Sequence, residues 1–305
     1  MFLKKPKEST DPALRSLVQK AARRGYGATV ERVARRLFEI GDKTWLRSRA
    51  VVITFEECWP LAHALTLERG AESKIDALLK VTKAVKQKDA IGLGAMAYAY
   101  HEGDHSVLEG LKNTTAVRIV SEALSRPSAF FEWALSQKMD AERERVVKAA
   151  KAYLAAATWG WDKTCILAGA YFAATDELPN IRNATPPLEN DFPYWVALDK
   201  HTPQGKAALQ RVANEFGVSY RKLIWAGFYF ESAKVNAVEI SPWWEAERRW
   251  RLQKAGMTLD SAAVLWDQIR PALEREIGPE AANLKQTAEV GSTGQIEIFA
   301  PAVQS

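Results

Sequence analysis

The sequence predicts an all-α fold. Apolar residues recur at the three- and four-residue spacing of helices along most of its 305 residues. Asp or Thr followed by Pro, and Gly after the last apolar position, supply repeated helix starts and stops. No alternating polar and apolar run is long enough to build a sheet. The 11 tryptophans fall at helical spacing among Ala and Leu, so most of them are expected to fill the core.

The first half of the chain is predicted to be a series of short helices. The first begins at Asp11-Pro12, a cap followed by proline, and closes at Gly25. Residues 28–40 form a second helix, and Asp42 can cap a third that runs to Pro60. Further helices are expected at 61–69, 72–86, 89–101, 104–111, 114–124, 127–137, 140–158 and 161–175.

A proline-rich stretch predicts a helical bundle or collar-like array in two lobes. Residues 176–193 contain four prolines among Asn and Asp, which indicates an irregular connection. Helices resume at 194–199, after Thr202-Pro203, and at 219–232, 242–255 and 259–276. The predicted units are an N-terminal domain with a basic surface at 1–175, the connection at 176–193, a C-terminal domain at 194–285 and a flexible tail at 286–305.

Composition indicates a globular chain outside the membrane. Hydrophobic residues make up 47% and charged residues 26%, which excludes a disordered or coiled-coil chain. No apolar run approaches the roughly 18 residues that a membrane span needs, and the first seven residues lack a secretory core. Two isolated cysteines are too few for a disulfide framework or a cysteine-based zinc site. We expect a cytoplasmic protein without a membrane partner.

Enzymatic motifs are scarce. The chain has no phosphate-binding P-loop, no G-x-S-x-G elbow and no dinucleotide fingerprint, so no cofactor is expected. The sharpest enzymatic signal is His101-Glu102-Gly103-Asp104-His105, which matches H-E-x-x-H, with two zinc ligands and a glutamate base. Gly103-Asp104 instead favours a helix stop followed by a new start, which would separate the two imidazoles. The third-ligand candidates, Glu109 and Glu122, have little support.

Positive charge is concentrated at the N-terminal end. Residues 1–50 hold 13 basic against 5 acidic residues, a net charge of +8, whereas the other 255 residues carry −3. Such a patch suits a polyanion, although a solvated helical surface would look the same. The candidate DNA-binding residues are Lys20, Arg23, Arg24, Arg32, Arg35, Arg36 and Arg47.

Three further patterns have structural as well as functional interpretations. Asp199-Lys200-His201-Thr202-Pro203-x-Gly205-Lys206 can place two lysines near a phosphate at a helix start, but a capping turn is favoured. The segment 243–251 interleaves Trp and Arg, as in stacking on unpaired bases or in a core helix. Arg49 beside Glu56 and Glu57 indicates an intrahelical ion pair.

The tail contains a short motif. Gln295, Ile296, Glu297, Ile298 and Phe299 resemble the peptide with which bacterial replication proteins bind the sliding clamp. An extended peptide of this kind places an aliphatic residue and Phe in an apolar pocket, while Gln bonds at the rim. The alternative is that the segment docks on its own domain as a short strand.

Residues 11–100 resemble the helical C-terminal collar of clamp-loader-type AAA+ ATPases. The resemblance rests on a basic helix, a glycine turn, a second helix and then Asp42-x-x-Trp45-Leu46-x-x-Arg49-x-x-Val52-x-x-x-Glu56-Glu57. The nearest pattern is that of the ATPases similar to Werner-helicase-interacting protein, in which these helices pack oligomers beside DNA. The ATPase module is missing here, so ATP hydrolysis cannot be carried over.

These observations predict a non-enzymatic accessory protein of DNA replication or repair, similar to a clamp-loader subunit. Its expected partners are DNA, a sliding clamp and ATPase clamp-loader subunits. Two alternatives remain open. One is a zinc-dependent hydrolase that uses His101, His105 and Glu102, and the other is a helical adaptor that binds only protein.

Overall fold

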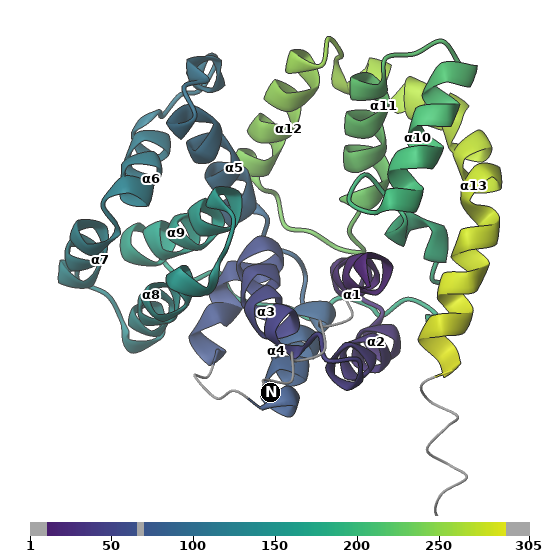
Figure 1. The fold of residues 1–305 in the computed structure, drawn as a ribbon. Coiled ribbons are helices and arrows are strands. Elements are labelled where there is room, and N and C mark those ends of the chain that lie inside the picture. The colour runs from purple at the N-terminus through teal and green to yellow at the C-terminus, as the bar shows by residue number, and fades with distance from the viewer. Residues whose placement is uncertain (1–10, 66–69, 291–305) are drawn as a thin grey trace, which may run out of the picture.

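The computed structural model describes residues 11–65 and 70–290, and within them the fold is all-α, as predicted. The described residues form thirteen α-helices and no β-strand, only three isolated bridges (Figure 1). The α-helices are α1 (Pro12–Arg24), α2 (Gly27–Glu39), α3 (Lys43–Cys58), α4 (Ala71–Lys83), α5 (Asp89–His101), α6 (Thr115–Ser125), α7 (Pro127–Ser136), α8 (Ala141–Tyr153), α9 (Gly160–Thr175), α10 (Pro203–Glu215), α11 (Tyr220–Gly227), α12 (Pro242–Lys254) and α13 (Leu259–Val290).

Local sequence signals set the ends of several helices. The Asp11 carboxylate accepts bonds from the backbone N–H groups of Ala13 and Leu14, and Pro12 takes the first helical position of α1. Gly25 ends α1 with φ +87°, a backbone conformation that residues with a Cβ rarely adopt. The start and stop expected for this helix are confirmed.

Other segments differ from the prediction. The helix expected at 61–69 is a 3₁₀ helix, η1 (Trp59–Ala64), and residues 66–69 lie outside the description. The segments 104–111 and 194–199 also reduce to short 3₁₀ helices, η2 (His105–Leu108) and η5 (Tyr194–Ala197). Helix α8 ends before the predicted residue 158, and a short 3₁₀ helix, η3 (Leu154–Ala156), follows it.

Helix α13 is longer than predicted. It continues past Gly278-Pro279 to Val290, so residues 286–290 belong to the helix and not to the tail. The apolar stripe persists beyond this break, which explains the continuation, because burial of that face outweighs the weak local propensity. Its buried members are Leu273, Ile277, Ala281, Leu284 and Ala288.

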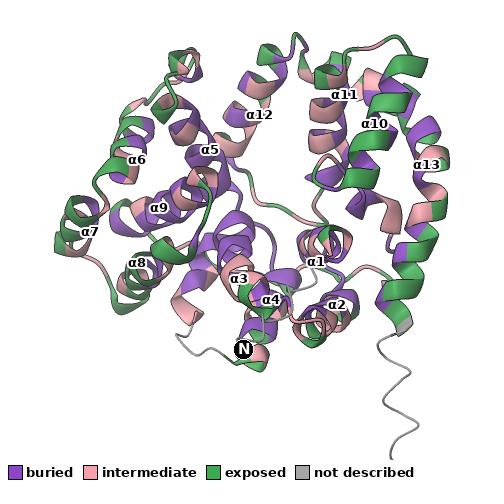
Figure 2. Cartoon of the chain, viewed as in Figure 1, coloured by how far each residue is buried: buried purple, intermediate pink, exposed green. Residues whose placement is uncertain are grey.

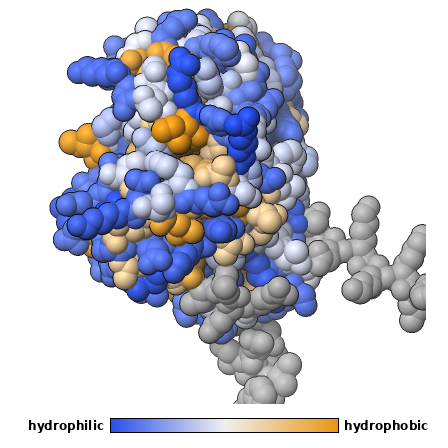
Figure 3. Space-filling view, turned by 90° about the vertical axis from the view of Figure 1, so that its left-hand side faces the viewer, coloured by the Kyte–Doolittle hydropathy of each residue, from blue (hydrophilic) through white to orange (hydrophobic). Residues whose placement is uncertain are grey.

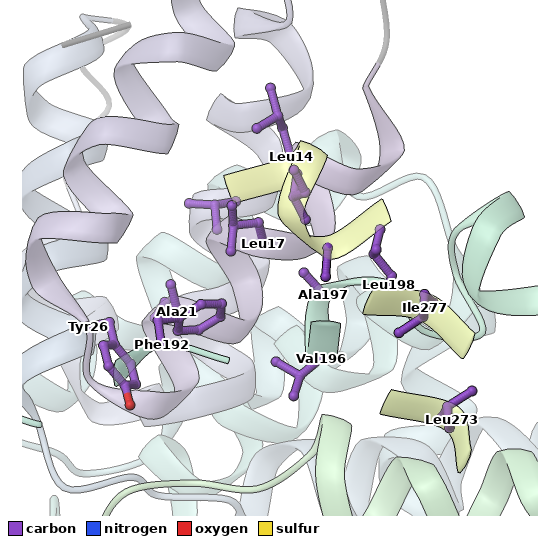
Figure 4. Packing of buried hydrophobic residues seen from close by; sticks show 14 of the residues in the cluster. Leu14, Leu17, Ala21, Tyr26, Phe192, Val196, Ala197, Leu198, Leu273 and Ile277 are labelled. Atoms are coloured by element: carbon purple, nitrogen blue, oxygen red, sulfur yellow. The ribbon is translucent and has the colours of Figure 1, made fainter. Parts of the chain in front are cut away.

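Two hydrophobic clusters form the core, and the buried residues gather on the inward faces of the helices (Figure 2). The first cluster joins α1, α2 and α4 to η5, α10, α11 and α13. Figure 4 shows Leu14 and Leu17 of α1 near Val196 and Leu198, with Leu273 and Ile277 of α13 alongside. The second contains α5 to α9 and part of α12, and α3 contributes to both. The predicted division into two lobes stays a prediction.

The outer surface is mixed in polarity. Figure 3 shows the face that carries α6 to α8, where hydrophilic residues dominate and hydrophobic ones gather in small patches. Across the described part of the chain, no helix has the length and apolar character needed to cross a membrane.

Candidate functional site

A cleft of about 730 Å³ lies where the two hydrophobic clusters meet. Its walls come from α1, α3, α5, α9, α11, α12 and two loops, the one before α9 and the one before α10. Figure 1 shows α1 and α3 on one side of this central region and α12 on another. The volume is within the range of small-molecule sites.

Two helices present one face each to the cleft. On α1 the lining residues are Pro12, Arg15, Ser16, Gln19, Lys20 and Arg23. On α3 they are Trp45, Ser48, Arg49, Val52 and Glu56. Steps of three and four residues place each set along one side of its helix. The polar stripe of α1 therefore faces an internal cleft, although the same stripe on a surface helix would face water.

The first charged group joins α1 to the segment before α10. Lys20 Nζ lies 2.7 Å from Asp199 Oδ2, and both side chains are buried. Asp199 Oδ1 also lies 3.0 Å from His201 Nδ1. Burial would raise the pKa of Asp199, but Lys20 and His201 lower it well below its usual range. The carboxylate is thus held ionised between two groups that line the cleft.

The second charged group is centred on Glu57, which is almost fully buried. Its carboxylate accepts bonds from Arg23 Nε at 2.7 Å and from Lys88 Nζ at 2.9 Å. Arg23 Nη1 also donates to the carbonyl of Ser232 at 2.7 Å. Burial opposes ionisation of Glu57, yet the two cations lower its pKa to about 2. Arg23 and Lys88 line the cleft, whereas Glu57 does not.

The third charged group fixes Arg49 on three sides. Its guanidinium donates to Gln19 Oε1 at 3.0 Å, Asp162 Oδ1 at 2.9 Å and Glu56 Oε1 at 2.8 Å. The expected pair between Arg49 and Glu56 is confirmed. Glu57 belongs instead to the group described above, because it lies on a different side of α3.

Aromatic side chains cover much of the remaining wall. Tyr98 and Trp161 meet edge to face with ring centroids 6.4 Å apart, and Trp159 is 71% exposed beside them in the loop before α9. Trp45, Trp225, Phe228 and Trp244 also line the cleft. The predicted Trp/Arg segment thus contributes Trp244 to the cleft, while Trp250 is buried in the second cluster.

Two buried oxygens of the lining have no hydrogen-bond partner among the described residues. They are Ser16 Oγ, in a side chain 3% exposed, and Glu56 Oε2, in a side chain 5% exposed. A buried polar atom without a partner is costly, so these two atoms destabilise the lining of the cleft. Both oxygens can accept hydrogen bonds, but neither has appreciable surface open to the cleft.

The structure changes the interpretation of the basic N-terminal end. Lys20, Arg23 and Arg24 are buried in ion pairs, so they do not belong to a solvated basic surface. Arg24 Nη2 donates to Glu231 Oε1 at 2.6 Å and does not line the cleft. The acids come from distant parts of the chain, which is why a local charge count missed them.

The other four predicted DNA-binding arginines remain at least partly exposed. Arg35 bonds to Glu31 and Glu72, and Arg36 lies 3.2 Å from Glu39. Arg32 lies beside Tyr194, and the Arg47 guanidinium lies 5.9 Å from the ring centroid of Phe38. None of the four lines the cleft.

The H-E-x-x-H segment is interrupted as its glycine predicted. Helix α5 ends at His101, Gly103 has φ +88°, and Asp104 caps η2 through the backbone N–H of Ser106. His105 stacks on Tyr100 with centroids 4.9 Å apart. Within residues 11–65 and 70–290, no group of three or more His, Cys, Asp and Glu side chains is placed to hold a metal ion.

The remaining sequence patterns have clear outcomes. The Thr202 hydroxyl accepts a bond from Gly205 N at 3.1 Å, and Pro203 begins α10, which confirms the capping turn. Lys200 of this turn lines the cleft, whereas Lys206 is exposed outside it. The clamp-like motif, with Gln295, Ile296, Ile298 and Phe299, lies outside the described residues.

Sequence reasoning also missed members of the site. Lys88, Trp161 and Asp162 join it only because α5 and α9 pack against α3. One sequence pattern could have indicated the cleft. It is a polar stripe along one face of a helix that has apolar residues on its other sides, formed by Ser16, Gln19, Lys20 and Arg23.

Comparison of the chain with protein-family models, with curated proteins and with solved structures gave no significant match.

Proposed function

We propose that the protein is a nucleic-acid-binding accessory protein of DNA replication or repair, and that its cleft receives an unpaired stretch of the strand. The observation that carries the proposal is the composition of this one cleft. Cations fixed by carboxylates line it together with a series of aromatic rings.

The cations suit phosphate groups. Arg15, Lys20, Arg23 and Lys88 line the cleft, while their partners Asp42, Glu57 and Asp199 do not. This arrangement holds the cationic groups in place before a ligand arrives, and it therefore lowers the entropy cost of binding. Arginine and lysine side chains supply most contacts to nucleic-acid phosphates.

The aromatic rings suit bases. Stacking on tryptophan or tyrosine tolerates any base, because every base has a π face, but it requires a base that is unstacked from its neighbours. A single-stranded or locally opened site is therefore favoured over an intact duplex.

Two features outside the cleft support a role in replication. The tail motif at Gln295–Phe299 suits a sliding clamp, and residues 11–100 resemble the collar helices of clamp-loader ATPases. Under this proposal the partly exposed Arg32, Arg35, Arg36 and Arg47 follow the strand outside the cleft. The clamp and ATPase clamp-loader subunits are the protein partners we propose.

Fluorescence anisotropy with labelled single-stranded and duplex oligonucleotides tests the cleft. Ser48→Asp places a negative charge in the lining, at a half-buried residue whose hydroxyl donates to the Thr44 carbonyl of its own helix. Ser73→Asp is the control, because it adds the same charge at a half-buried serine of α4 outside the cleft. We expect single strands to bind more tightly, with an affinity that falls steeply with salt. Ser48→Asp should weaken binding at least tenfold, and equal binding by both variants would exclude the cleft as the site.

Titration with the cognate sliding clamp tests the tail. Replacing both Ile298 and Phe299 by Ala removes about 3 kcal/mol or more of apolar burial, enough to abolish a micromolar interaction. Thermal melts serve as the control. A lower melting temperature in the double variant would mean that the tail docks on its own protein instead.

A further inference from the structure

Lys200 differs from the other lysines of the cleft. Its Nζ lies 3.8 Å from the ring centroid of Trp225 and 4.2 Å from that of Phe228. Lys20 and Lys88 both form buried ion pairs with carboxylates. No hydrogen bond or ion pair joins the Lys200 ammonium to another residue within the described part of the chain. A half-buried lysine thus has its amine against two rings at the wall of a cleft.

The surroundings of Lys200 make its neutral form easier to reach than that of an exposed lysine. Burial lowers its pKa to about 8, although the neighbouring Asp199 opposes this change. Arg251 and Lys20 lower the pKa further, and Glu247 acts in the opposite direction. About a tenth of the amine is therefore unprotonated at pH 7, far more than for an ordinary lysine, and an unprotonated lysine amine is a nucleophile toward carbonyl groups.

We propose that Lys200 forms an imine with an aldehyde carried by the ligand of the cleft, and that this ligand is DNA with an abasic site. This inference rests on the proposed function, because the phosphates and neighbouring bases bring the sugar to Lys200. The ring-opened abasic deoxyribose exposes an aldehyde at C1′. The ring can open because the nucleobase, which keeps it closed in intact DNA, has been lost.

The reaction balances without an oxidant or a metal. The Nζ lone pair attacks C1′, the carbonyl oxygen takes two protons and leaves as water, and a protonated imine remains. A base then removes a C2′ proton, and the electron pair released expels the 3′ phosphate and so cleaves the strand. Water hydrolyses the conjugated imine, which returns Lys200 as the free amine and releases an unsaturated aldehyde.

His201 is placed to be that base. It follows Lys200 in the chain, lines the same cleft, and its Nδ1 lies 3.0 Å from Asp199 Oδ1. Partial burial lowers its pKa, so the ring is mostly neutral near pH 7. When Nδ1–H donates to Asp199, Nε2 carries the lone pair that accepts a proton.

Borohydride trapping tests the proposal directly. The probe is a labelled oligonucleotide with one abasic site, incubated with the full chain and borohydride, which reduces an imine to a stable covalent bond. Lys200→Ala should lower the trapped product at least 100-fold. Lys206→Ala is the matched control, because Lys206 lies six residues away on α10 but outside the cleft, and it should trap as the wild type does. His201→Gln should keep trapping but slow strand cleavage at least tenfold.

Four outcomes separate this inference from the proposed function. An oligonucleotide with a tetrahydrofuran abasic analogue has no aldehyde, so its binding reports the cleft alone. Tight binding of this analogue without trapping of the aldehyde substrate would overturn the imine and leave the proposed function standing. Trapping that persists in Lys200→Ala would also overturn it. Trapping of pyridoxal 5′-phosphate at Lys200, without any adduct to abasic DNA, would overturn the DNA assignment, and failure of the tetrahydrofuran analogue to bind would overturn the proposed function.

Discussion

Lys20 of α1 and Asp199, which precedes α10, form a buried ion pair with Nζ and Oδ2 2.7 Å apart. The pair ties α1 to a segment that follows the proline-rich connection. Arg24 makes a second such link, to Glu231 beyond α11. Leu14 and Leu17 of α1 also pack in the first hydrophobic cluster, so α1 is fixed against the C-terminal helices by charge as well as by apolar packing.

Removing one partner of this pair should destabilise the protein strongly. Lys20→Met leaves a buried carboxylate without its main cation, which typically costs about 3–5 kcal/mol. The double variant Lys20→Met/Asp199→Leu should lose much less than the two single variants together, because no unpaired charge remains. Urea unfolding measures each value.

The control is Lys148→Ala, which breaks the exposed ion pair with Glu144 and should change stability by about 0.5 kcal/mol or less. Additive losses would contradict the coupling.

Glu57 should make the free energy of unfolding fall in acid. Its pKa is about 2 in the folded state against an ordinary value of 4.5, so below pH 4.5 the unfolded chain binds more protons than the folded one. The stabilisation by Glu57 is complete above about pH 4.5 and is lost as the pH falls toward 2, on the order of 3 kcal/mol. Free energies of unfolding measured from pH 7 to pH 2.5 should fall less steeply in Glu57→Gln. Parallel curves for the wild type and Glu57→Gln would show that Glu57 does not cause this loss of stability.

Local signals predicted the helices better than they predicted the charges. Caps at Asp11 and Thr202 and the stop at Gly103 act within a few residues, so the sequence alone places them correctly. By contrast, Arg24 was assigned to a basic surface because its partner, Glu231, is more than 200 residues away. The helical periodicity of a sequence carries no information about an ion pair between residues so far apart.

The cleft was beyond sequence reasoning for the same reason. Its lining combines helix faces that are each ordinary amphipathic stripes, and only their packing makes them share a space. Sequence reasoning did single out Lys200 and Trp244 within larger patterns, but it could not bring the two into one wall. The extension of α13 was missed because Gly278-Pro279 is a strong local stop that tertiary burial overrides.

The closest approach of α5 to α9 should depend on Gly94. A Cβ at Gly94 would lie 2.7 Å from the backbone of Cys165, so Gly94→Ala forces two packed helices apart. We expect a loss of about 1–3 kcal/mol in thermal or urea unfolding. Gly278→Ala in α13 is the control, because no neighbouring atom lies within 4 Å of the place that its new Cβ would take. Pro279 disfavours helical backbone at a preceding residue with a Cβ, which offsets the gain in helix propensity, so the control should change stability by about 1 kcal/mol or less. A gain in stability at Gly94 would refute the close packing of the two helices.

Trp159 should contribute to nucleic-acid affinity without contributing to stability. It is 71% exposed at the edge of the cleft, in the loop between η3 and α9, so truncating it removes little buried area. Stacking of one base on an aromatic side chain is worth about 1–3 kcal/mol, so Trp159→Ala should weaken single-strand binding by about 5- to 150-fold. Its melting temperature should match that of the wild type.

Phe216→Ala is the control, since Phe216 is also an aromatic residue at the surface, 41% exposed, but lies outside the cleft. Anisotropy titrations with the same oligonucleotide compare the three proteins, and an equal loss of affinity in both variants would mean that strand binding does not depend on stacking at the cleft.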